Sequence, residues 1–90
     1  MKVNYTSEFI KKLAHQVNYI AIDKPFTARK FKNELLAKAE KTKNLPYSYR
    51  KSIFFDDDSI RDLVFKGYCI VFRIKNNSIT IFSLVKYEAY

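Results

Sequence analysis

The spacing of apolar residues changes about halfway along the chain, and this change limits the folds that the chain can adopt. Up to about residue 42, apolar residues recur every three or four positions, as on one face of a helix. The runs 60–66, 68–75 and 78–86 are instead rich in β-branched and aromatic residues, which is typical of strands. The sequence therefore predicts an α+β domain in which helices pack on a sheet.

The first half of the chain predicts a short strand followed by two helices. Residues 1–6 alternate as in a strand, and Thr6 or Ser7 can cap a helix over roughly 7–22. Pro25 suits the start of a second helix, over roughly 26–42, because the missing N–H of proline costs nothing there. The expected apolar stripes are Ile10, Leu13, Val17 and Ile20, with Phe9 and Ala14 beside them, and then Ala28, Phe31, Leu35 and Ala39.

The second half predicts an antiparallel meander with short turns. Asn76 and Asn77 lie between two strand-like runs and tolerate the positive φ of a type I′ hairpin. Lys66 and Gly67, the only glycine, mark the preceding turn. In the central run, Tyr68, Ile70, Phe72 and Ile74 should share the face that packs on the two-helix hairpin, and Cys69, Val71 and Arg73 should share the other.

The composition excludes several classes of protein. Ninety residues fit one domain, spanning 1–90, and a single glycine excludes Gly-rich phosphate-binding loops. The lone cysteine cannot form an internal disulfide, which fits a reducing compartment, and no apolar run is long enough to span a bilayer. We therefore expect a cytoplasmic protein that does not associate with membranes.

The charge is unevenly distributed along the chain. The formal net charge is +8, and nine Lys and Arg residues lie between Lys24 and Lys51 against only two Glu residues. A concentrated basic segment favours a polyanion or an acidic protein as partner. The alternative is a solvated, lysine-rich helix face without a specific partner.

The order of these elements resembles that of the RelE/ParE toxin superfamily. The most specific part is 60–74, where Arg61-Asp62-Leu63 is followed by Gly67-Tyr68 and an apolar strand. The resemblance implies a growth-inhibiting toxin of a type II toxin–antitoxin system that needs no cofactor and is neutralised by a cognate acidic antitoxin. ParE-like members act on DNA gyrase, whereas RelE-like members cleave mRNA on the ribosome. A non-toxic binding module of the same fold is a third reading.

RNA cleavage by 2′-OH attack needs a base, cations that stabilise the phosphorane, and an acid for the leaving oxygen. RelE-like members supply these groups from sheet Lys and Arg residues and a C-terminal Tyr or His. The corresponding candidates here are Arg61, Arg73, Lys86, Tyr87 and Tyr90. The resemblance also places an arginine directly after Gly-Tyr, where this chain has Cys69. This departure favours the ParE-like reading.

Other residues allow two readings each. Tyr47, Tyr49, Arg50 and Lys51, with Lys66, combine aromatic and basic groups as in a nucleic-acid or target contact, but the tyrosines could equally form a lid over the sheet. Arg61 could pair with an aspartate of the 56–58 run, which we expect to be a turn without a metal. The only histidine, His15, is expected on the polar surface of the first helix.

Overall fold

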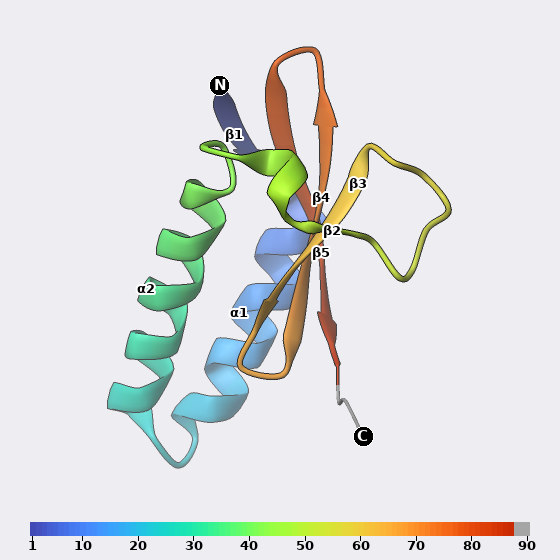
Figure 1. The fold of residues 1–90 in the computed structure, drawn as a ribbon. Coiled ribbons are helices and arrows are strands. Elements are labelled where there is room, and N and C mark those ends of the chain that lie inside the picture. The colour runs from blue at the N-terminus through green and yellow to red at the C-terminus, as the bar shows by residue number, and fades with distance from the viewer. Residues whose placement is uncertain (88–90) are drawn as a thin grey trace.

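The computed structural model, which describes residues 1–87, has a five-stranded sheet with two helices on one face (Figure 1). The elements in chain order are β1 (Lys2–Tyr5), α1 (Ser7–Ala21), α2 (Pro25–Lys41), the 3-10 helix η1 (Pro46–Ser48), β2 (Arg50–Lys51), β3 (Ile60–Phe65), β4 (Tyr68–Lys75) and β5 (Ser78–Lys86). The strand order is β1-β5-β4-β3-β2. The predicted α+β architecture is confirmed.

The sheet is mixed rather than wholly antiparallel. β3, β4 and β5 form the predicted antiparallel meander, whereas β1 pairs with β5 in parallel, Val3 opposite Ile79. Parallel pairing needs a long connection between the two strands, and the whole rest of the chain separates β1 from β5. β2 is a two-residue edge strand that the sequence did not reveal, with Arg50 opposite Asp62.

Local sequence signals explain where the elements begin and turn. The Thr6 hydroxyl accepts a hydrogen bond from the Phe9 N–H at 3.1 Å and so caps α1, while Pro25 lies in the first turn of α2. Asn76 and Asn77 both have positive φ, 50° and 59°, as a type I′ turn requires. The Lys66-Gly67 turn also has positive φ at both residues.

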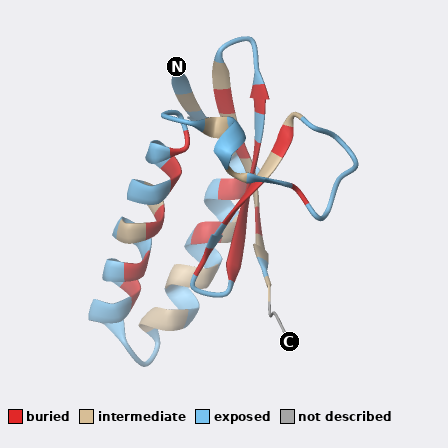
Figure 2. Cartoon of the chain, viewed as in Figure 1, coloured by how far each residue is buried: buried red, intermediate tan, exposed pale blue. Residues whose placement is uncertain are grey.

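The core lies between the helices and the sheet, where the buried residues of both layers face one another (Figure 2). Phe31, Leu35, Ile70 and Phe72 are buried together, as predicted. The stripe of α1 is centred differently from the prediction. Its buried residues are Phe9 and Leu13, while Ile10 is 47% exposed and Ala14 is also exposed. The larger Phe9 ring, stacked on Tyr5, takes the buried position instead.

The strand β4 is also buried on the face away from the helices, which we call the outer face. Cys69 and Val71 are both fully buried there. The loop 52–59 lies on this side of the sheet (Figure 1), and Phe55 of the loop contacts Phe82 of β5 with ring centroids 5.6 Å apart. Phe82 is the extra residue of a β-bulge, because Val71 pairs with Ser83 but Phe72 pairs with Ile81.

Candidate functional site

A polar cluster on the outer face joins β2, β3, β4 and the end of β5. The guanidinium of Arg50 lies 3.3 Å from Oδ2 of Asp62 and 3.3 Å from Sγ of Cys69. It also lies over the ring of Tyr87, 5.4 Å from the ring centroid. We call these four residues the Arg50 cluster. An arginine from β2, two strands away from β4, therefore contacts Cys69, the position at which the family resemblance places an arginine.

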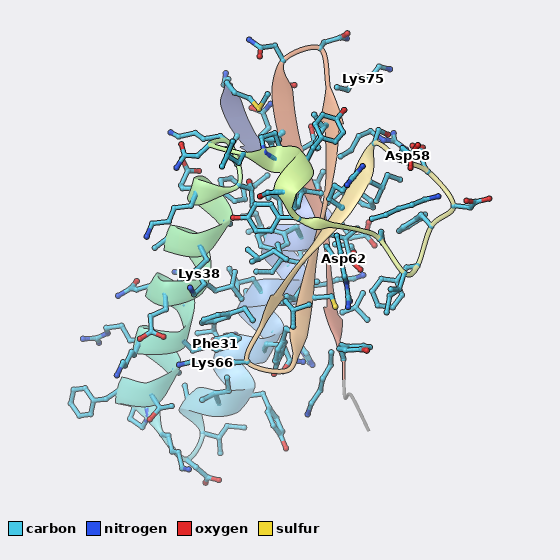
Figure 3. All side chains as sticks on the ribbon, in the orientation of Figure 1. Phe31, Lys38, Asp58, Asp62, Lys66 and Lys75 are labelled. Atoms are coloured by element: carbon cyan, nitrogen blue, oxygen red, sulfur yellow. The ribbon has the colours of Figure 1, made fainter. Side chains whose placement is uncertain are left out.

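Asp62 anchors this cluster, and Figure 3 shows it toward the loop side of the sheet. Its side chain is fully buried, and Oδ2 also accepts the Ile53 N–H at 3.0 Å. Within residues 1–87, its other oxygen, Oδ1, is buried without a hydrogen-bond partner. A buried carboxylate of this kind needs a cation, which Arg50 supplies. The hydrogen bond from Ile53 to the same carboxylate holds the start of the loop 52–59 against the sheet. Sequence analysis did not identify this anchor; the signal that could have indicated it is the single aspartate within the strand-like run 60–66.

The Cys69 thiol has no properties of a nucleophile. Burial raises its pKa, the nearby Asp62 carboxylate raises it further, and Arg50 offsets only part of the effect. The neutral thiol therefore predominates at neutral pH, and the side chain is fully buried. The arrangement fits a structural pairing of the exposed Arg50 with the buried Asp62 and Cys69 rather than a thiol active site.

The candidate catalytic residues do not converge. Arg61 pairs with Phe72 and therefore lies on the helix side of the sheet. Arg73 follows Phe72 along β4 and points to the opposite, outer face. Lys86 opposes Tyr68, which is five residues from Arg73 along β4, or about 17 Å at the rise of a strand. Tyr87 lies in the Arg50 cluster. Tyr90 lies outside the described residues.

Arg61 holds the chain segment that precedes β3. Its Nε donates to the carbonyl oxygen of Asp58 at 2.8 Å, and Nη1 donates to that of Tyr49 at 3.1 Å. Its guanidinium also lies 4.9 Å from the centroid of the Tyr47 ring. Arg61 thus reaches the aspartate run through a backbone carbonyl, whereas the carboxylates of Asp56 and Asp58 pair with Lys51 at 3.0 and 3.7 Å.

The candidate target-binding residues form two separate groups. Tyr49 is half-buried and packs edge-on against Phe72, so it acts as a lid, whereas Tyr47 on η1 is 59% exposed. Arg50 and Lys51 follow directly in the sequence and form β2. Lys66 lies elsewhere, in the turn between β3 and β4 (Figure 3), and pairs with Glu34 of α2 at 2.9 Å.

Two grooves provide concave surfaces. The first, about 440 Å³ on the outer face, is called the outer-face groove. Phe55, Ile60 and Phe82 supply its apolar side chains, and Arg73 and Lys75 supply its positive charge. The second, about 370 Å³, lies between α1 and the end of β5 and is called the α1–β5 groove. Its lining residues are Lys11, Lys12, His15, Gln16, Tyr68, Leu84 and Lys86.

Within residues 1–87, no three His, Cys, Asp or Glu side chains gather in a way that could hold a metal ion. In the same part of the chain, neither helix combines the length and apolar character that a membrane span requires. In the 56–58 run, the Asp57 carboxylate accepts hydrogen bonds from the N–H and hydroxyl of Ser59, at 2.9 and 2.7 Å, as in an Asx turn.

Comparison with known proteins places the chain beside one family. The family model described as "ParE toxin of type II toxin-antitoxin system, parDE" matches residues 3–88. Among solved structures, a chain of the chromosomal ParDE TA system from P. aeruginosa matches with a TM-score of 0.82 and 15% identity. The match covers 98% of this chain and 97% of that chain. A search of curated proteins returned no match.

Proposed function

The chain belongs to the ParE toxin family of type II toxin–antitoxin systems, and from this premise we propose that it inhibits growth by acting on a protein target, DNA gyrase. In this proposal a cognate, acidic antitoxin neutralises the toxin in the cytoplasm. The observation that carries the proposal is the separation of Arg61, Arg73 and Lys86. Cleavage of RNA requires base, acid and cations around one phosphate, within hydrogen-bond reach.

The competing function is ribosome-dependent mRNA cleavage. Arg50 supplies a guanidinium on the outer face, yet it pairs with the buried Asp62 carboxylate at 3.3 Å, which neutralises the charge locally. Arg61 is held by backbone carbonyls. These contacts fit structural roles, and they support the protein-directed function over the nuclease.

The outer-face groove is the proposed docking surface for the antitoxin. Its apolar side chains, including Phe55 and Phe82, offer burial to an apolar anchor, and Arg73 and Lys75 offer charge to flanking acidic residues. An acidic antitoxin segment with one or two large apolar residues satisfies both. A Phe55→Ser, Phe82→Ser variant should then weaken antitoxin binding.

The experiment that tests the target is a supercoiling assay with purified gyrase, ATP and relaxed plasmid. We expect the protein to inhibit supercoiling or to trap cleaved plasmid, and we expect the antitoxin to restore activity. Relaxation by a type I topoisomerase, run in parallel, controls for sequestration of the plasmid and should be unaffected. Unchanged supercoiling at a molar excess of a protein that still stops growth would contradict the gyrase proposal.

A further inference from the structure

The α1–β5 groove collects positive charge from two elements that are far apart in the sequence. The charges are those of Lys11 and Lys12, which come from α1 and have His15 beside them, and of Lys86, which comes from the end of β5 on the opposite wall. Among residues 1–87, none of those that line the groove is acidic. Like charges gathered around one concavity repel one another, and a bound anion would relieve that repulsion.

Several of the groove's polar groups are held in place. Nζ of Lys12 lies 3.2 Å from the Ser83 hydroxyl and 3.6 Å from the carboxylate of Glu8, which does not line the groove. The Tyr68 hydroxyl donates to Oε1 of Gln16 at 2.9 Å, so Gln16 offers its amide N–H groups to a ligand. The groove therefore presents N–H donors and positive charge together.

The two grooves differ in what they offer a ligand. Tyr68 and Leu84, which line the α1–β5 groove, are only 8% and 7% exposed, so each offers little of its side chain to an apolar ligand. In the outer-face groove, Phe55 alone is 43% exposed. The outer-face groove thus suits an amphipathic acidic peptide. The α1–β5 groove suits a ligand whose binding depends on charge and on accepted hydrogen bonds.

We propose that the α1–β5 groove binds the phosphodiester backbone of a nucleic acid. Phosphodiester oxygens are permanently charged acceptors, and they match three lysines, an imidazole and an amide around one groove. Among the described residues that line the site, the only aromatic ring is that of Tyr68, which is 8% exposed and offers little surface for base stacking, so binding should be independent of base sequence. This inference does not depend on the gyrase proposal, because a protein without effect on gyrase would still bind a phosphodiester here.

The test is a titration of the full chain with a fluorescent 20-base-pair DNA duplex and with a single-stranded RNA of equal charge. Binding is followed by anisotropy at several salt concentrations. The groove variant is Lys11→Gln, Lys12→Gln, Lys86→Gln. The matched control is Lys24→Gln, Lys32→Gln, Lys41→Gln, which removes the same charge from residues exposed outside the groove. Circular dichroism and thermal unfolding verify that both variants fold.

We expect the wild-type chain to bind the duplex, with log Kd changing linearly with log salt. Each lysine that contacts a phosphate should contribute roughly one unit of slope, so the groove variant should lose about two to three units and at least tenfold in affinity. The control variant should keep its slope within about one unit. If RNA shows the same losses and the same affinity, the shared backbone is the ligand. If the chain binds one of the two nucleic acids more tightly, that nucleic acid is the source of the phosphodiester ligand.

Two results would overturn the proposal. Equal losses in the groove and control variants would show that net charge alone drives binding. A ten-residue polyglutamate peptide serves as the third probe. If it bound the wild-type chain more tightly than the duplex did, and lost more affinity in the groove variant, the site would be a peptide site instead.

Discussion

At the scale of single residues, the Arg50 cluster shows how one charged pair ties an irregular segment to the sheet. Asp62 accepts hydrogen bonds from Arg50 of β2 and from the backbone of Ile53 in the following loop. Sequence patterns did not predict this contact, because β2 has only two residues and no periodicity of its own. The sequence has Cys69 where the family resemblance places an arginine. Only the tertiary structure shows that the guanidinium of Arg50 lies beside Cys69.

Replacing Arg50 with alanine should lower the free energy of unfolding by about 1.5–3 kcal/mol, because the buried Asp62 carboxylate loses a charged donor. Urea unfolding measures the effect. Lys51→Ala, which removes an exposed ion pair from the same strand, is the control and should cost less than about 1 kcal/mol. Adding Asp62→Asn to Arg50→Ala should recover part of the loss. A double variant that loses the full sum of the single losses would contradict the pairing.

Stability should also fall at alkaline pH. Burial raises the pKa of Cys69 above its ordinary 9.0, and burial together with the hydrogen bond to Glu40 raises the pKa of Tyr5 above 10.0. The native state then retains protons that the unfolded chain releases, so the free energy of unfolding is highest below pH 9.0 and declines as pH rises past each ordinary value. Cys69→Ala should flatten the decline that begins near pH 9, and Tyr5→Phe the one that begins near pH 10. An unchanged decline in both variants would exclude these groups as its cause.

At the scale of elements, sequence periodicity predicted the features that depend on residues close together in the sequence. The bounds of β4 and β5, the two helices to within one or two residues, and the Asn76-Asn77 turn all follow from propensity, capping and turn chemistry. Periodicity did not predict the bulge at Phe82, which depends on how β5 pairs with β4. It also misplaced Ile10, because two apolar neighbours competed for the buried position and the contact of Phe9 with Tyr5 decided between them.

The central strand should carry much of the core's stability. Phe72 is fully buried in β4 and receives the edge of the Tyr49 ring. Truncation to alanine leaves a cavity, so Phe72→Ala should cost about 3–5 kcal/mol in chemical denaturation. Val64→Ala, at an exposed position of the neighbouring strand β3, provides the comparison and should cost far less. A small effect of Phe72→Ala would show that the ring is not part of a tightly packed core.

At the scale of the whole molecule, a net charge of +8 should accelerate association with an acidic antitoxin. Between about 0.05 M and 0.5 M salt the Debye length shrinks about threefold, so the association rate constant should fall markedly while dissociation changes less. Stopped-flow mixing of the two proteins measures both rates. An association rate constant that does not change with salt would show that electrostatic steering does not contribute to association.

The candidate nuclease residues illustrate the limit of sequence reasoning at this scale. Arg61, Arg73 and Lys86 have residue types suited to RNA cleavage, but strand alternation and register direct them to different faces and ends of the sheet. Residue type is visible in the sequence, whereas convergence on one phosphate depends on long-range strand pairing. The groove between α1 and β5 was missed for the same reason, since His15 and Lys86 meet there from opposite ends of the chain.

The most direct measurement of the central claim is primer extension on translated mRNAs after induction of the toxin in growing cells. We expect growth to stop without new mRNA ends phased to the ribosomal A site, because Arg61, Arg73 and Lys86 lie on different faces and ends of the sheet. Strong A-site-phased cuts that disappear in Arg61→Ala, Arg73→Ala or Tyr87→Phe variants of unchanged stability would contradict the account and establish the chain as an mRNA endonuclease.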